Sequence, residues 1–556
     1  MDRSRWICLC HALLAGFVLS QSPVAIGQEV HVPEAVNLQD ESADQLDDLP
    51  QAELPPPSDC SRETCCCGRC VDWKTVPGSI RPLHRPGNFT VPPTGCGYYS
   101  LTDALHGNCR DKPRKNGYPP FAMMPPSFFD ADFRYVESLP HCDRTLSEKL
   151  KRWQLSECVT FSTGGQFWSR YMNEHNSRLS PNDNEYTLSR VRAYGDLLVG
   201  DHLRFFGEFI WADAFGEDLA PLPIDVNLGD ALNLFVEANL FDYCGKPVYA
   251  RVGRQELLFG SQRLVSTLDW ANTRRTFDGV RVFRTGEKWD LDAFYTAFVP
   301  VNPDGLDQLD DRREFAGAWA TYRPQKGHFV DFFYLYLEDE RPVTQQMIVR
   351  SPTDVHTVGT RNAGDHCGWL WDFWGAVQFG EQDNQNLLAG ACTASLGRHW
   401  KCARWSPTAW ICYDYASGDP NPNAGQANTF NHLYPFGHYY LGWADQVGRQ
   451  NIHDINAHLF LYPSNWITLW LQYHHFRLDE SRDALYNAGG VAIRRDATGA
   501  AGKDVGDEID VVVNFHLAHN SDLLLGYSHL FGGRFLRDTV GPRDSSLFYL
   551  MFQQRW

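Results

Sequence analysis

Apolar and polar residues alternate with a period of two from about Glu157 to the end of the chain. Along 190–197, for example, Val191 and Leu197 take one parity and Arg192 takes the other. Such alternation is typical of a β-strand whose two faces meet different surroundings. We call each such alternating segment a ladder. Each ladder has roughly the 9–11 residues that a tilted strand needs to cross a membrane. Similar ladders recur at 203–211, 232–240, 248–255, 279–284, 289–299, 315–322, 329–337, 369–379, 455–462, 467–473, 509–515 and 523–530.

The connections between these ladders alternate in length. Short turns occur at 199–202, 244–246, 285–288, 323–327, 463–465 and 518–522. Longer segments lie between them, at 172–185, 213–229, 260–273, 300–312, 339–365, 416–452, 478–506 and 531–545. Short turns at one end and long loops at the other are the expected asymmetry of an outer-membrane β-barrel. We would not expect a soluble β-sandwich to keep this alternation over so many strands.

The positions of the two chain termini restrict the number of strands to an even one. Counting from either end places both termini on the short-turn side, which requires an even number of crossings. The ladders give about 17 crossings, so we expect one further strand between Gly380 and His453. The sequence therefore predicts an all-β fold, an 18-stranded antiparallel transmembrane β-barrel over residues 157–556.

Composition narrows the class of protein. No segment after the leader has the roughly 18 successive apolar residues of a spanning helix, so a membrane-spanning chain must cross as a closed barrel. Aromatic residues make up 13% of the chain, which suits the interfacial girdles of a barrel and equally a carbohydrate-binding β protein. The net charge of −18 argues against nucleic-acid binding.

The start of the chain has the features of a secretory signal. Arg3 and Arg5 precede the apolar run 6–19, and 25–27 offers small residues for cleavage. We therefore expect residues 1–27 to be a signal peptide.

Residues 28–156 differ from both the signal and the ladders, and we expect a Pro- and Cys-rich periplasmic extension that is partly disordered. Its segment 32–57 is acidic and Pro-rich, whereas 146–155 could form one short helix. Nine of the chain's 16 cysteines lie between the signal and residue 160, most densely at 60–70. In an exported chain this favours disulfides over a zinc site, with the pairing open.

Arginines concentrate in 249–281, which is predicted to be a strand, a loop and a second strand. Parity places Val252 and Val280 on the lipid side and Arg251 and Arg281 inside. Only 10 of the 50 basic residues are Lys, so the other 40 are Arg. The guanidinium group of Arg binds carboxylates in a bidentate manner. A ring of such residues would lower the barrier for an anionic solute. We predict a solute path lined or flanked by Arg192, Arg251, Arg254, Arg263, Arg274, Arg275 and Arg281.

Inward-facing carboxylates give these arginines a second interpretation. They could pair with the arginines into a solvated ladder that holds the barrel rigid, or widen the range of permitted solutes. They are Glu208, Glu237, Asp290, Asp292 and Asp372.

The spacing Gly253-Arg-Gln255, Gln262-Arg263, Asp269-Trp270, Arg275 and Phe277-Asp-Gly279 resembles the alginate-export family of outer-membrane β-barrels. A second block at 416–451 extends the resemblance, which covers about 157–556. The resemblance implies 18 strands and passive export or diffusion of a uronate polysaccharide or its oligomers. The block falls in the longest loop, a candidate gate. Its gate residues would be Asp419, Phe430, Tyr434, His438 and Tyr439.

We expect a non-enzymatic monomer without a cofactor or metal. The chain has no GxSxG, HExxH or P-loop motif, and His474 and His475 would face opposite sides of a strand. Segment 546–556 ends on Trp556 and resembles the closing-strand signal that outer-membrane assembly machinery recognises. The expected partners are this machinery, outer-membrane lipid and an anionic polysaccharide or oligosaccharide.

Three alternatives stay open from the sequence. A general small-solute porin would keep the barrel and show little charge selectivity. A cell-surface binding or anchoring protein would use the extension and the aromatic residues. An outer-membrane enzyme could use paired carboxylates such as Asp310 and Asp311 on an acidic polysaccharide.

Overall fold

The computed structural model describes residues 86–118, 127–422 and 425–556. The chain divides into two units, Met1–Thr64 and Cys65–Trp556, and every described residue belongs to the second. The expected signal at 1–27, the acidic segment 32–57 and the cysteine cluster at 60–70 therefore lie outside the described residues.

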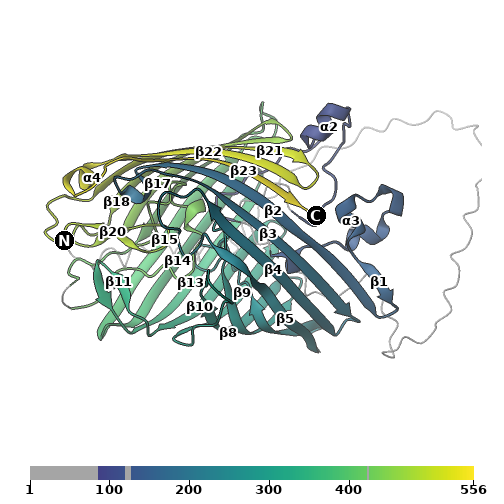
Figure 1. Ribbon diagram of the computed structural model, residues 1–556, viewed down its shortest axis with the longest axis horizontal. Helices are drawn as coiled ribbons and strands as arrows, with labels where there is room; N and C mark the ends of the chain where they lie inside the picture. Colours follow the sequence, from purple (N-terminus) through teal and green to yellow (C-terminus); the bar gives the residue numbers. More distant parts are fainter. Residues whose placement is uncertain (1–85, 119–126, 423–424) are drawn as a thin grey trace, which may run out of the picture. The chain divides into compact units, whose positions relative to one another are not determined.

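Eighteen antiparallel strands close into a barrel, as the alternation predicts (Figure 1). Closure is made by β2 and β23, which pair from Gln166 opposite Arg555 to His175 opposite Ser546. The first nine strands are β2 (Val159–His175), β3 (Asn184–Val199), β4 (Leu203–Phe215), β5 (Asn227–Tyr243), β6 (Lys246–Gln255), β7 (Thr276–Thr285), β8 (Trp289–Val299), β9 (Arg313–Gln325) and β10 (His328–Asp339). The other nine are β13 (Thr353–His366), β14 (Trp369–Gln382), β15 (Gln385–His399), β16 (Thr408–Ala416), β17 (Ile452–Ser464), β18 (Ile467–Leu478), β21 (Asp504–Ala518), β22 (Ser521–Gly532) and β23 (Ser545–Arg555).

The remaining elements are short and are not among the 18 strands of the barrel wall. β1 (Trp153–Ser156) pairs with the start of β2, and the hairpins β11–β12 (Val343–Gln345, Ile348–Arg350) and β19–β20 (Ala484–Tyr486, Ala492–Arg495) belong to loops. The α-helices are α2 (Leu101–His106), α3 (Leu146–Lys149) and α4 (Arg534–Asp538). Single 3₁₀ turns are η2 (Phe128–Asp130), η3 (Arg134–Ser138), η4 (His141–Asp143), η5 (Ser177–Leu179) and η6 (Gly437–Tyr439). No helix in the described part of the chain is long and apolar enough to cross a membrane.

The strands expose apolar side chains on one face and bury charged ones on the other. In β4, Leu203 and Phe205 are exposed on the outer face, whereas Arg204 and Glu208 are buried on the inner face. The same parity runs around the barrel, so hydrocarbon meets an apolar band and the charges point into the lumen.

Three strands differ in position from the sequence-based expectation. Two strands, β15 and β16, lie between Gly380 and His453 instead of one, and β13 occupies most of the segment 339–365 that we expected to be a loop. β13 and β15 are rich in Thr, Gly, Ala and Ser, so neither face carries a strong apolar signal. Helix α3 ends at Lys149 instead of continuing to residue 155.

The two ends of the barrel differ, as the loop lengths predict. The longer connections share one end with α4 and β20, whereas α2, α3 and the C-terminus lie at the short-turn end (Figure 1). One exception is the connection between β14 and β15, which is only two residues long. Short turns face the periplasm in outer-membrane barrels, so we place α2 and α3 on that side.

Two long loops fold into the lumen. We call residues 256–275 the first inner loop and residues 417–451 the second inner loop. The loops contact each other through backbone hydrogen bonds, from Tyr434 N to the Leu264 carbonyl and from Phe436 N to the Gln262 carbonyl, each at 2.9 Å. Most of their side chains are buried together with the inward faces of the strands.

A third part of the chain also lies inside the barrel. We call residues 86–91, 116–118 and 127–139 the inner segment. The indole of Trp410 donates to the Phe89 carbonyl at 2.9 Å, and the guanidinium of Arg204 donates to the Phe129 carbonyl at 2.8 Å. Part of the expected periplasmic extension therefore packs against inward-facing side chains, which the sequence did not predict.

The outward parity predicts the effect of a charge on the outer face. Ile411 on β16 is 73% exposed beside Leu396 and Ala457, so Ile411→Arg would place a guanidinium in hydrocarbon. We expect a loss of up to about 4 kcal/mol in the free energy of unfolding, measured by urea titration in phospholipid vesicles. Ile411→Ala controls for the lost side chain. Equal stability of the Arg and Ala variants would contradict the membrane-facing assignment.

Candidate functional site

Two arginines of the predicted path lie on the buried inner face with a carboxylate beside each. The guanidinium of Arg251 on β6 is 2.6 Å from Glu237, and that of Arg281 on β7 is 2.8 Å from Asp292. Arg251 also lies over the ring of Phe235, with its guanidinium carbon 4.2 Å from the ring centroid. Each guanidinium is thus neutralised by a carboxylate on the neighbouring strand.

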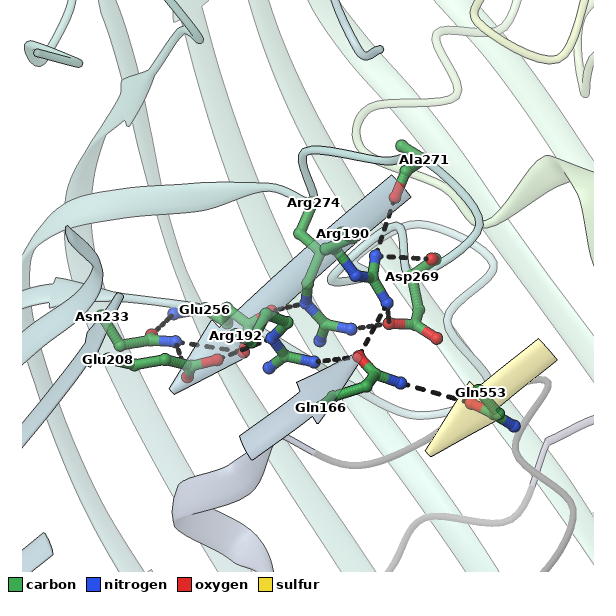
Figure 2. Close-up of polar contacts among 10 residues, drawn as sticks. All are labelled: Gln166, Arg190, Arg192, Glu208, Asn233, Glu256, Asp269, Ala271, Arg274 and Gln553. Carbon is green, nitrogen blue, oxygen red and sulfur yellow. Dashed lines mark hydrogen bonds and ion pairs between the residues drawn. The ribbon is translucent and has the colours of Figure 1, made fainter. Parts of the chain in front are cut away.

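Arg192 belongs to a larger polar cluster, which we call the arginine network (Figure 2). It joins strands β2 to β5 to both ends of the first inner loop. Arg192 Nε donates to Glu208 at 2.6 Å, and Arg190 Nη2 donates to Asp269 at 3.0 Å. Arg274 forms ion pairs with Glu256 and Asp269. The network consists of Gln166, Arg190, Arg192, Glu208, Asn233, Glu256, Asp269 and Arg274.

Two uncharged amides complete the arginine network. The Gln166 carbonyl accepts from Arg190 at 3.0 Å and from Arg192 at 3.3 Å. The Asn233 amide donates to Glu208 at 2.9 Å and to Glu256 at 3.3 Å (Figure 2). Three guanidinium groups face three carboxylates, so the network is electrically balanced.

Arg263 and Arg275 lie in or beside the inner loops in contrasting surroundings. Arg263 Nη2 is 3.2 Å from Asp372, and its guanidinium carbon lies 3.8 Å from the ring centroid of Tyr440. Among the described residues, Arg275 donates only to the Pro435 carbonyl, at 3.4 Å, and it lies over the ring of Tyr434. No carboxylate among the described residues lies within 4 Å of the Arg275 guanidinium.

Parity separates Arg254 from the inward-facing arginines of the predicted path. It pairs across the sheet with the exposed Leu234, so its side chain lies on the outer face, opposite to Arg251. There it forms an ion pair with Asp278 at 3.0 Å. The strand continues to Gln255, so the two-residue parity still holds at position 254.

Sequence reasoning missed Arg170 on β2. Its guanidinium carbon lies 3.7 Å from the ring centroid of Trp270 and 4.9 Å from that of Trp168. Its Nε and Nη1 are buried without a hydrogen-bond partner, and no described carboxylate lies within 4 Å. Arg170 has the same parity as the inward-facing Trp168, and Arg190 has the same parity as Arg192. The alternation alone would therefore have placed both arginines in the lumen.

The five predicted gate residues are all buried in the second inner loop. The ring of His438 stacks on Trp270 at 3.7 Å between centroids, and Nδ1 of His438 is 3.0 Å from Asp445. Asp419 N donates to Asp483 at 2.8 Å. The other three gate residues, Phe430, Tyr434 and Tyr439, pack among aromatic and aliphatic side chains.

The second inner loop also buries an uncharged histidine. Burial lowers the pKa of His432 to about 3, and the nearby Arg275 acts in the same direction. His432 therefore adds no positive charge at neutral pH. No cluster of three His, Cys, Asp or Glu side chains that could hold a metal ion occurs in the described ranges.

A closed barrel with an apolar outer face and a charged inner face defines the class of outer-membrane β-barrel proteins. The profile of the alginate export family matches residues 159–549. The chain belongs to this family and is a protein of the outer membrane.

The solved structures that match the chain share little sequence with it. OccK8 (OprE) of Pseudomonas aeruginosa is 10% identical, with 71% of this chain and 98% of that chain covered and a TM-score of 0.48. OpdK of Pseudomonas aeruginosa with vanillate is 13% identical, with 71% and 98% covered and a TM-score of 0.47. OccAB1 of Acinetobacter baumannii is 9% identical, with 71% and 96% covered and a TM-score of 0.48. No curated protein matches the chain.

The ion pair between Arg192 and Glu208 predicts a coupled loss of stability. Arg192→Met or Glu208→Met alone leaves a buried charge unpaired, and each should lower the free energy of unfolding by about 3–5 kcal/mol. The double variant removes both charges and should cost less than the sum of the two. Urea unfolding in phospholipid vesicles, followed by tryptophan fluorescence, measures all four proteins. Strictly additive losses would show that the pair is not coupled.

Proposed function

We propose that the chain is a passive channel for anionic solutes, namely a uronate polysaccharide or its oligomers, crossing an arginine-lined lumen. The family and the barrel support an outer-membrane channel. The observation that carries the choice of solute is that two arginines, the buried Arg170 and the half-buried Arg275, have no carboxylate partner within 4 Å among the described residues. A buried cation that no carboxylate neutralises favours a passing anion.

The paired arginines have a different role in this proposal. Arg192, Arg251, Arg263, Arg274 and Arg281 each have a carboxylate partner, so their charge is largely cancelled at close range. They would offer hydrogen bonds to a passing carboxylate only by exchanging partners.

The remaining expected partners follow from the same barrel. We infer that the outer face contacts lipid directly and that the protein works as a monomer. β23 carries Phe548 and Leu550 on its outer face and is followed by Trp556, which supports recognition of this last strand by assembly machinery. We also infer that residues 1–27 are removed on export and that the part of 28–156 outside the inner segment serves on the periplasmic side.

A general small-solute porin is the second candidate. It is favoured by the inward carboxylates of β17 and β21, because Asp454, Glu508 and Asp510 lie around His474 without an arginine partner among the described residues. These acidic groups would offset Arg170 and Arg275, and selectivity would then be weak.

Ion selectivity in planar bilayers tests the proposed function. Under a KCl gradient the reversal potential of the wild-type protein should show anion preference, and Arg170→Gln with Arg275→Gln should shift it toward cations. The matched control is Arg251→Gln with Glu237→Gln, which removes one charge of each sign and should leave the preference unchanged. Uronate oligomers should reduce the current of the wild-type protein more than neutral oligosaccharides do. Weak selectivity of the wild-type protein and no block of its current by uronate oligomers would favour the general porin.

A further inference from the structure

The inner segment occupies the space through which a solute would pass. We propose that it is a plug, which holds the channel closed until it leaves the lumen. This proposal rests on the channel function alone and is independent of the charge of the solute.

The plug covers arginines of the proposed path. The ring centroid of Phe128 lies 4.1 Å from the guanidinium carbon of Arg192, and that of Phe129 lies 4.4 Å from that of Arg251. Both guanidinium groups are fully buried in this arrangement. A solute cannot reach these two faces while the phenyl rings cover them.

Aromatic packing holds the same two rings against the wall. Phe128 lies 5.0 Å from Tyr194, and Phe129 lies 5.6 Å from Phe206 and 5.3 Å from Phe235, between ring centroids. The wall side chains belong to β3, β4 and β5 and point inward. An inward aromatic surface next to charged groups is thus covered by the chain's own rings.

The other part of the plug binds β16, β17 and the second inner loop. Gly87 N donates to the Tyr440 hydroxyl at 2.8 Å, and the Asn88 side chain lies 3.0 Å from His458 and 3.3 Å from the Cys412 sulfur. The plug therefore contacts two separated regions of the wall. It also contacts the loop that carries the predicted gate.

Polar contacts at the short-turn end fasten the plug. Lys151 donates to the carbonyl oxygens of Thr163 and Trp556, the latter at 3.0 Å, and its ammonium lies 4.9 Å from the ring centroid of Phe133. The Tyr118 hydroxyl also donates to the Trp556 carbonyl, at 3.1 Å. None of these contacts is part of the strand pairing, so departure of the plug would leave the barrel closed.

The first test removes the two rings. Phe128→Ala with Phe129→Ala should raise the mean conductance in planar bilayers several-fold over the wild-type protein. Leu105→Ala, on the exposed surface of α2, is the matched control and should have no effect. An unchanged conductance would overturn the proposal, because the inner loops alone would then close the lumen.

The second test locks the plug in place. Asn88→Cys places a thiol beside the buried Cys412, and oxidation should join the two and lower the open time tenfold or more. Reduction should restore the wild-type open time, and adding Cys412→Ala should abolish the effect. If the cross-linked protein conducts as often as the reduced one, the plug proposal fails. The reversal potential measures ion preference and is independent of the open time. A failure of the plug proposal can therefore be distinguished from a failure of the anionic-solute proposal.

A second inference rests on an independent pair of thiols. Gly97 and Arg110 exchange two backbone hydrogen bonds of 2.9 Å, which bring the chain before and after α2 together. Cys96 and Cys109 lie next to this bridge, and both are exposed. The neighbouring Cys109 thiol raises the pKa of the Cys96 thiol. Neither Cys96 nor Cys109 is in a disulfide in this structure.

We infer that Cys96 and Cys109 form a disulfide in the exported protein. The two thiols lose two protons and two electrons, and a disulfide-bearing oxidant of the compartment accepts them and becomes a dithiol. Alkylation without reduction, followed by peptide mass analysis, should find a linked Cys96–Cys109 peptide, whereas the exposed Cys244 and Cys402 are alkylated. In Cys96→Ser, Cys109 should become alkylated. Alkylation of both thiols in the unreduced wild-type protein would overturn the inference.

Discussion

Backbone pairing between β2 and β23 is the constraint on which the rest of the molecule depends. In hydrocarbon no water is present to satisfy an edge strand, so the sheet is stable only when its first and last strands meet. Closure fixes which face of every strand points inward, and this turns a period of two in the sequence into two chemically distinct surfaces. The arginines, the inner loops and the inner segment all take their positions from this division.

The lumen is packed like a protein interior, and its charges follow the rules of an interior. Arg251, Arg281 and the arginine network each combine a carboxylate with an aromatic ring or an amide, because a buried guanidinium without such partners is costly. The same side chains thereby stabilise the barrel and line the proposed path. Arg170 and Arg275 differ from these arginines, and at Arg170 two indole rings stand where a carboxylate would be expected.

The parity of the sequence was sufficient to predict the barrel and the inward positions of Arg192, Arg251 and Arg281. The number of 18 strands also required the even count that a closed barrel needs, because the ladders alone gave about 17 crossings. It was insufficient where both faces of a strand carry small or polar residues, as in β13 and β15. The pairing of Arg274 with Glu256 could not be predicted, because it requires the first inner loop to turn inward. The positions of Phe128 and Phe129 depend likewise on contacts with strands far away in the sequence.

The location of the inner segment restricts the order in which the molecule can assemble. Residues 86–91 precede β2, yet they lie against β16, β17 and the second inner loop. Either these residues already lie among the strands when β23 pairs with β2, or they enter the lumen afterwards from the periplasmic end. Assembly therefore requires more than insertion of the strands into the membrane, because residues 86–91 must also be placed inside the barrel.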